Sequence, residues 1–205
     1  MCYNTCVIKH NGGTFMPPKV KFSREEILSA AYELVRNNGK DALSARSLAS
    51  ALGVSTAPIF TAFESIDALT DAVKARAKAS YDAYLTEGLS HPIPFKGTGL
   101  AHIRFAKDEP LLFRFLFVES GEADPLRHYL PGDCENERMV RNTVESGYGY
   151  TTEEAKHLYN HLSVYVHGLA MLYAYGHAVF DEGDVDRMLT EVFLALKDKM
   201  EAKNQ

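Results

Sequence analysis

The stretch LGVSTAPIFTAF, Leu52 to Phe63, decides the fold of this 205-residue chain. It follows a short helical pattern, turns at Gly53 and starts another short helix, like the second half of a helix-turn-helix. Gly53 stands where the chain needs a left-handed residue to leave the first helix, and Ser55 is the expected N-cap of the second. Between Gly53 and Phe63 there is no Lys, Arg, Asn or Gln to read a base edge. Two interpretations are therefore open, a DNA-reading helix or a helical hairpin that only resembles one.

The residues around this turn meet the packing requirements of a helix-turn-helix. The first helix is expected to start after Ser44 as its N-cap, and Ala49 is small where the two helices must cross closely. Ile59 and Phe63 are expected to anchor the second helix to a core. Pro58 is tolerated in the first turn, because its missing N–H would have been unpaired there anyway. A short helix held in this way can present its other face to a major groove.

Nearly every other segment repeats its apolar residues at the helical period, and no alternating run supports a strand. We therefore predict an all-α fold of about nine helices, with a three-helix N-terminal head and a larger C-terminal helical bundle. Ser23 with Glu26 and Thr151 with Glu154 have the spacing of a capping box. Four helices are predicted to begin after Ser23, Ser44, Ser55 and Ser65. Five further helices are predicted over residues 99–108, 110–120, 134–145, 151–180 and 184–200. Residues 1–18 are expected to be a disordered tail, residues 19–65 the head and residues 66–205 the bundle, with the helix after Ser65 linking the last two.

The charge is unevenly distributed along the chain. The net charge is −5, yet residues 17–80 carry nine Lys or Arg against seven Asp or Glu, and residues 81–205 carry twelve against twenty. A mildly basic first third on an acidic remainder fits a head that contacts DNA and a body with another task. The 3 cysteines, Cys2, Cys6 and Cys134, make no disulfide framework and no zinc ligand set. An odd count fits a reducing compartment, so we expect a cytoplasmic protein.

One uncharged segment has nearly the length of a membrane span. It runs from Leu162 to Phe180 over nineteen residues. Histidines and tyrosines are spread along it rather than placed at its ends, and the residues that follow, Asp181 and Glu182, have the wrong sign for a cytoplasmic anchor. We predict a helix buried in protein and no membrane association.

A specific order of residues runs through the head: Leu43, Arg46, Leu48-Ala49, Leu52-Gly53-Val54-Ser55, Ile59-Phe60, Phe63 and Leu69. This order resembles the N-terminal signature of TetR-family transcriptional regulators and covers roughly Ser23 to Val73. Further along, VHGLAMLY, Val166 to Tyr173, resembles the Trp-His-Gly element of one TetR-type C-terminal domain, with Val166 at the Trp position.

The resemblance implies a ligand-responsive transcriptional regulator, most simply a repressor. Members of the family are homodimers whose last two long helices form a four-helix interface, and their two heads bind a palindromic double-stranded DNA operator. A small, fairly apolar ligand in the C-terminal bundle shifts the linking helix and releases the DNA. Residues 19–65 would then be the DNA-binding domain, and residues 66–205 the ligand-binding and dimerisation domain.

The head departs from the family at positions that commonly touch DNA. Phe60, Ala62 and Ile66 stand where the family often has Tyr, His and Lys, so phosphate affinity and salt dependence should be reduced. We expect Arg46 to bind a phosphate, with a solvated surface arginine as the alternative. Hydroxyl and methyl groups are expected to read thymine methyls and base edges. Phe60 either stacks on DNA or packs inside the head. The expected DNA-binding residues are Ser44, Arg46, Ser55, Thr56, Ala57, Pro58, Phe60 and Thr61.

A ligand cavity in the bundle should be mainly apolar with few polar groups. Ordinary core packing is the alternative for each residue expected to line it. Small residues along the long helix, Gly168, Ala170, Ala174, Gly176 and Ala178, suit either a dimer seam or close packing within the chain, and we favour the seam. The expected pocket residues are Phe105, Phe113, Phe117, Tyr165, His167, Leu169 and Tyr173.

Two functions of other classes compete with a regulator. The departures at Ala62 and Ile66 are compatible with a helical small-molecule-binding or protein-interaction module whose DNA head is degenerate. An enzyme is the weaker alternative, since no nucleophile–base pair is readable. His157 and His161 share a helix face and suit a transition metal, but no third ligand completes the set. We predict no catalytic residue, no metal and no cofactor.

Overall fold

The computed structural model describes residues 22–119, 142, 144–147 and 149–202. The predicted tail, the cysteines and most of the helix predicted over 134–145 lie outside these residues. Within them there is no strand, and an N-terminal helix-turn-helix region precedes a larger helical part, so the predicted fold class is confirmed. The elements are α1 (Arg24–Asn38), the 3-10 turn η1 (Lys40–Ala42), α2 (Ala45–Leu52), α3 (Ala57–Ala62), α4 (Ile66–Leu89), α5 (Pro94–Asp108), α6 (Pro110–Phe117), α8 (Thr152–Ala174) and α9 (Glu182–Glu201).

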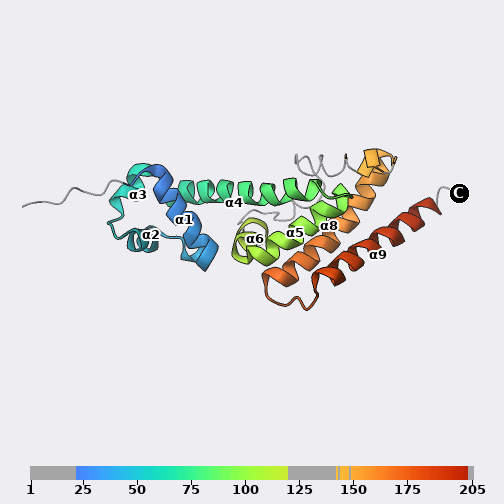
Figure 1. Ribbon diagram of the computed structural model, residues 1–205. Coiled ribbons are helices and arrows are strands. Elements are labelled where there is room, and N and C mark those ends of the chain that lie inside the picture. The colour runs from blue at the N-terminus through green and yellow to red at the C-terminus, as the bar shows by residue number, and fades with distance from the viewer. Residues whose placement is uncertain (1–21, 120–141, 143, 148, 203–205) are drawn as a thin grey trace, which may run out of the picture.

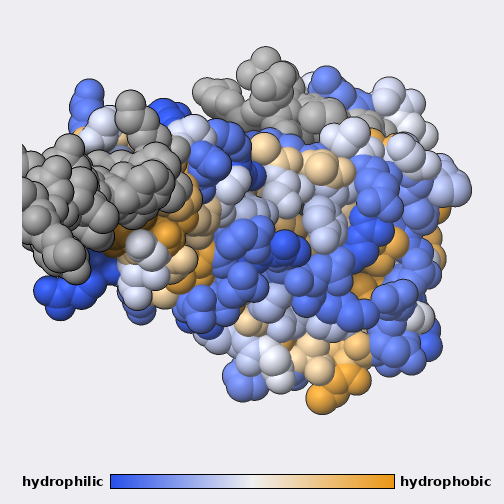
Figure 2. Space-filling model, turned by 60° about the vertical axis from the view of Figure 1, so that its left-hand side comes forward, coloured by the Kyte–Doolittle hydropathy of each residue, from blue (hydrophilic) through white to orange (hydrophobic). Residues whose placement is uncertain are grey.

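Two groups of helices are joined by one long helix (Figure 1). The head consists of α1, α2 and α3 at one end of α4, and the body consists of α5, α6, α8 and α9 along its other end. The helices α5, α8 and α9 lie in successive layers, and α6 sits where the head and the body meet. Hydrophilic residues cover most of the face shown in Figure 2, with smaller hydrophobic patches between them.

The helix starts that were predicted from capping residues are confirmed. In α1 the Ser23 N–H donates to Glu26 Oε2 at 2.7 Å and the Glu26 N–H donates to Ser23 Oγ at 3.2 Å. The same reciprocal pair joins Thr151 and Glu154 at the start of α8. Each pair satisfies two N–H groups that the helix itself leaves unbonded. Ser44 caps α2 and Ser65 caps α4 through their side-chain oxygens.

Two predicted helix starts in the head and body are wrong. The N-cap of α3 is Thr56 rather than Ser55, and its side chain makes no capping hydrogen bond. The helix α5 begins at Pro94 instead of residue 99. Proline fits the first turn of a helix, because its fixed φ is helical and its missing N–H has no partner to lose.

The predicted end of the long helix is also wrong. The prediction placed it near Phe180, whereas α8 ends at Ala174. Gly176 has φ +69°, and its N–H donates to the Tyr173 carbonyl at 3.0 Å while the His177 N–H donates to the Leu172 carbonyl at 2.8 Å. This pattern of two bonds ends a helix by satisfying its last carbonyls. The uncharged segment is therefore a helix followed by a loop, and α9 begins at Glu182 with Asp181 as its N-cap.

The helix α4 belongs to two parts of one hydrophobic core. Leu69 and Val73 are completely buried near its start, and Ala77 is completely buried at its middle. Tyr81 is buried one turn later, with its ring 5.0 Å from Phe117 of the body. A single buried stripe therefore runs along α4 from the head into the body.

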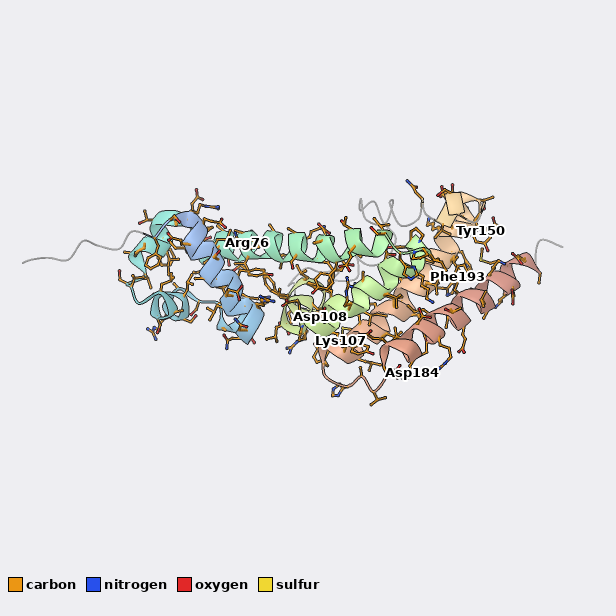
Figure 3. The ribbon with its side chains drawn as sticks, viewed as in Figure 1. Arg76, Lys107, Asp108, Tyr150, Asp184 and Phe193 are labelled. Carbon is orange, nitrogen blue, oxygen red and sulfur yellow. The ribbon has the colours of Figure 1, made fainter. Side chains whose placement is uncertain are left out.

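Polar contacts attach the head to the rest of the chain at three further places. The Arg36 guanidinium of α1 binds the Glu109 carboxylate between α5 and α6 with two nitrogens, one of which, Nε, lies 2.8 Å from Oε2. This carboxylate raises the pKa of Arg36. Lys40 Nζ donates to the Glu119 carbonyl at 2.6 Å. On α4, Arg76 (Figure 3) binds the Glu25 carboxylate, and these contacts fix the direction in which the head faces.

We predict that Gly88→Ala destabilises the junction of α4 and α5. A Cβ atom at Gly88 would lie 2.6 Å from the Gly97 carbonyl oxygen and 2.9 Å from the Ala101 Cβ. Because one of these atoms is backbone, the two helices must move apart, and we expect a loss of about 2 kcal/mol in the free energy of unfolding. Denaturant unfolding of the purified chain measures it.

Gly147→Ala is the matched control, because Gly147 is exposed, its φ is not positive and a Cβ there meets no atom within 4 Å. At an exposed helical position the change should be neutral or stabilising by up to about 1 kcal/mol. Equal stability of the Gly88→Ala variant and the wild type would contradict the close packing of α4 on α5.

Candidate nucleic-acid interface and cavity

The residues predicted to bind DNA lie on the surface of the head. The inward side of the helix-turn-helix is formed by Leu48, Ala49, Ile59 and Phe63, each at most 5% exposed. The opposite side of α2, the turn and α3 points to solvent. Pro58 is partly exposed there, and the exposed residues are Ser44, Arg46, Ser55, Thr56, Ala57, Phe60 and Thr61.

The turn between α2 and α3 has the predicted geometry. Gly53 adopts φ 68° and ψ 30°, the left-handed region, and the Val54 N–H donates back to the Ala49 carbonyl at 3.0 Å. A residue with a Cβ is strained in this conformation. The turn therefore depends on Gly53, and it directs α3 away from the axis of α2.

The hydroxyl groups on the exposed side differ in what they already bind. Ser44 Oγ accepts the Ser47 N–H at 3.1 Å as the cap of α2, and Thr61 Oγ1 donates to the Ala57 carbonyl at 2.9 Å. Thr56 makes no capping hydrogen bond. Its hydroxyl is therefore better placed than that of Ser44 or Thr61 to bind an external group.

The three departures from the family pattern have visible structural consequences. Phe60 is 50% exposed, so its ring lies outside the core of the head. Ala62 and Ile66 are partly buried against the hydrophobic core. These two positions thus contribute apolar packing in place of the donors that the family often has.

Arg46 differs from the other arginines of the head. No hydrogen bond or ion pair joins it to another described residue, whereas Arg36 and Arg76 are bound to Glu109 and Glu25. Sequence reasoning missed Arg24, whose guanidinium lies 4.3 Å from the centre of the Phe63 ring. This cation–π contact joins residues far apart in the sequence, so no local signal could have found it.

Several residues predicted to line a ligand pocket meet in the body as an aromatic cluster. We use this name for His102, Phe105, Phe113, Phe117 and His167. Phe105 and Phe113 are completely buried, and the Phe113 ring centre lies 5.0 Å from that of Phe117 and 5.7 Å from that of His167. His102, which was not among the residues predicted to line the pocket, is 2% exposed. The cluster is packed core with two imidazoles in it.

The other predicted pocket residues lie around or away from the cluster. Leu169 is buried in the same core, and Tyr165 packs partly buried against it. The Tyr173 hydroxyl donates to the Phe180 carbonyl at 2.6 Å, near the start of α9. His102 Nδ1 lies 3.0 Å from the Tyr81 hydroxyl of α4, which ties the cluster to the linking helix.

A cavity of about 590 Å³ opens elsewhere in the body, and we call it the groove. It lies between the C-terminal end of α4, one face of α5 and the first turns of α9. Of the residues predicted to line a pocket, Tyr173 alone borders it. Its rim carries charged side chains, including Glu87, Arg104, Lys107 and Glu182.

No three His, Cys, Asp or Glu side chains converge as a metal site within the described ranges. His157 and His161 do lie side by side on α8, with ring centres 4.5 Å apart. None of the helices described here is long and apolar enough to cross a membrane.

Comparisons with known proteins agree with the geometry of the head. Residues 27–73 match the family model of bacterial regulatory proteins, tetR family. The fold is similar to the crystal structure of a TetR-like transcriptional regulator from Rhodococcus sp. RHA1, with a TM-score of 0.61 and 14% sequence identity over 83% of this chain and 93% of that chain. The family model covers the head, and the similarity to the solved structure shows the fold. No curated protein matches the sequence.

We predict that the buried imidazoles make the body less stable in acid. Burial lowers the pKa of His167 to about 4 and that of His102 well below its ordinary value. In the unfolded chain both bind protons near pH 6.5, so the unfolded state takes up protons first and stability falls as the pH drops from 6.5 toward 4. His167→Gln should reduce the loss between pH 7 and 5 by about 1 kcal/mol, allowing for its partial exposure.

Denaturant unfolding at the two pH values measures this difference. His177→Gln is the control, because His177 is exposed beyond the end of α8. The same pH dependence in the wild type and in His167→Gln would show that His167 is not held neutral by burial.

Proposed function

We propose that this protein is a transcriptional regulator that binds a palindromic DNA operator as a homodimer and represses transcription until a small molecule binds its body. Residues 19–65 would be the DNA-binding domain and residues 66–205 the ligand-binding and dimerisation domain. The observation that carries the proposal is the exposed side of α3, which the left-handed turn at Gly53 and the buried anchors Ile59 and Phe63 hold outward. The similarity to TetR-type regulators supports it and points away from an enzyme.

DNA would be read through a small set of contacts. Thr56, Ala57 and Thr61 present hydroxyl and methyl groups, which suit thymine methyls and a few base edges in the major groove. Arg46, exposed near the start of α2, would bind a phosphate and set the register of the head. With few charged contacts, binding should depend less on salt than it does for a strongly basic head.

An exposed apolar stripe on the outer helices supports a homodimer. Val164 is 60% exposed and Leu172 38% exposed on α8, and Gly168 lies between them at the same helical spacing. Leu194 of α9 is 46% exposed. A second copy placed on this stripe would cover it, and Gly168 would let the helices approach closely.

The small residues predicted to form a dimer seam are not all available for one, because some of them pack within the chain. Ala170 and Ala174 are 0% and 7% exposed, so they pack within the chain and the predicted seam is wrong at these two positions. Gly168 is exposed, and Gly176 and Ala178 follow the end of the helix. The proposed seam therefore runs along Val164, Gly168 and Leu172.

Ligand response would act through the aromatic cluster. The Tyr81 ring of α4 lies 5.2 Å from Phe105 and 5.0 Å from Phe117. A fairly apolar molecule inserted among these rings would displace α4, whose other end forms part of the head. The Trp-His-Gly subtype of the body stays a prediction, with Val166 partly buried, its Cγ2 3.3 Å from where a Cβ of Gly99 would lie.

We predict that Arg46→Ala weakens binding to all DNA sequences by a similar factor. Removing one phosphate contact should lower the slope of log affinity against log salt by about 1 for each protomer. Electrophoretic mobility shifts at several salt concentrations measure both quantities. Arg187→Ala is the control, because Arg187 is an exposed arginine of α9 in the body.

Thr56→Ala completes this test, because it should change base preference at one position of each half-site and leave the salt slope unchanged. Thr86→Ala, an exposed threonine of α4 in the body, is its control. An unchanged salt slope in Arg46→Ala would refute its phosphate role. No affinity of the wild type for any DNA at low salt would favour the binding module with a degenerate head.

We also predict that Val164→Glu yields a monomer, since a carboxylate in an apolar seam is costly to bury. Light scattering after size-exclusion chromatography measures the mass. Ala79→Glu adds the same single charge at an exposed position of α4, outside the stripe, and should leave the dimer intact. A wild-type chain that is monomeric at micromolar concentration would contradict the proposed seam.

A further inference from the structure

The groove has the size and lining of a small-molecule site. Its volume of about 590 Å³ lies within the usual range for ligand pockets. Leu100, Ala101 and Val185 give it an apolar lining, and charged side chains border it. Such a site suits a molecule with an apolar body and a charged end.

Two cations stand on the same face of α5 at the groove. Arg104 and Lys107 are three residues apart, so they are neighbours on the helix surface. Figure 3 shows Lys107 near the C-terminal end of α5, opposite Asp184 in the first turn of α9. The neighbouring Glu182 raises the pKa of Lys107, which keeps it charged.

Both cations now hold carboxylates of the chain itself. Arg104 Nη1 and Nη2 donate to Glu87 Oε1 and Oε2 at 3.0 and 2.6 Å. Lys107 Nζ donates to Glu182 Oε1 at 3.0 Å. Each pair shows that a carboxylate fits against the cation at this position.

The carboxylate of Glu182 is easy to displace from Lys107. The Glu87 and Glu182 side chains are 67% and 89% exposed, more than the 43% and 48% of Arg104 and Lys107. Exposed ion pairs contribute little to stability, because water screens them and ordering the side chains costs entropy. An external carboxylate can therefore take the place of Glu182 at small cost, while Glu182 turns into solvent.

The third acidic residue at the groove is held differently. Asp186 Oδ1 lies 2.6 Å from Lys96 Nζ, and Lys96 is only 18% exposed and also donates to the Thr190 hydroxyl at 2.8 Å. This pair neutralises Asp186 and keeps it in place. Lys96 does not line the groove, so the cations that an external carboxylate can reach there are Lys107 and Arg104.

We propose that the groove binds a small organic acid, with its carboxylate on Lys107 and Arg104 and its apolar body on Leu100 and Val185. The site is separate from the aromatic cluster and from the DNA-binding face. Its occupant would touch α4 at Gly88, near the end of the helix that the head and the body share. Binding can be measured on the full chain without DNA, so its failure is distinguishable from a failure of operator binding.

Isothermal titration of octanoate, below its micelle-forming concentration, into the purified chain tests the proposal. We expect saturable binding of one octanoate per chain, and much weaker binding of octylamine and octanol. Lys107→Gln should weaken octanoate binding by about tenfold, the effect of losing one charge-assisted hydrogen bond. Glu182→Gln should instead tighten it several-fold, because it removes the competing carboxylate.

Two control variants correct for net charge. Lys197→Gln and Glu191→Gln remove the same charges from α9 at positions that do not line the groove, and neither should change the affinity by as much as twofold. Absence of octanoate binding to both the wild type and Glu182→Gln would overturn the proposal. The proposal would also be overturned if Lys107→Gln bound octanoate as tightly as the wild type does, or if Glu182→Gln bound it more weakly. Binding of octylamine as tight as that of octanoate would overturn it as well.

Discussion

The rest of the structure depends on one constraint, which is that α4 is buried at both of its ends. Leu69 and Val73 of this helix lie in the core of the head, and Tyr81 and Leu85 lie in the core of the body. A helix held along one continuous stripe behaves as a stiff rod, because protein interiors are close-packed and tolerate little displacement. The position of α3 is therefore linked to the packing around Tyr81, although the two lie in different parts of the molecule.

The contact of Arg36 with Glu109 makes this link stronger. It ties the end of α1 to the junction of α5 and α6, the helices that supply most of the aromatic cluster. The head is thus attached to the body both by apolar packing along α4 and by the polar contacts of Arg36 and Lys40. Any molecule that moves α5 or α6 must disturb both the apolar and the polar attachments. This shared disturbance is the physical basis for a coupling between the body and the DNA-binding face.

Local signals in the sequence were enough to predict most of the fold. The caps at Ser23, Ser44 and Thr151 and the left-handed turn at Gly53 each depend on residues within one helical turn, so their patterns can be read directly. The end of α8 was missed, because Gly176 lies within an apolar run whose periodicity continues past it. The prediction placed too much weight on the absence of charge.

The sites were only partly predictable, because they depend on contacts between distant segments. The exposed side of the helix-turn-helix followed from its periodicity. The hydrogen bond between His102 and Tyr81 joins two helices, and the cation–π contact of Arg24 with Phe63 joins the start of α1 to the residue that ends α3. The groove arises where α5 meets α9, and no motif marks either wall.

The central claim, that two heads of a homodimer read an operator through α3, is tested most directly by hydroxyl-radical footprinting on the DNA upstream of the gene. The account predicts two protected half-sites of related, inverted sequence on one face of the DNA, with centres about one helical turn, roughly 10 base pairs, apart. No protected palindrome at low salt, or protection of a single half-site by a monomer, would contradict it.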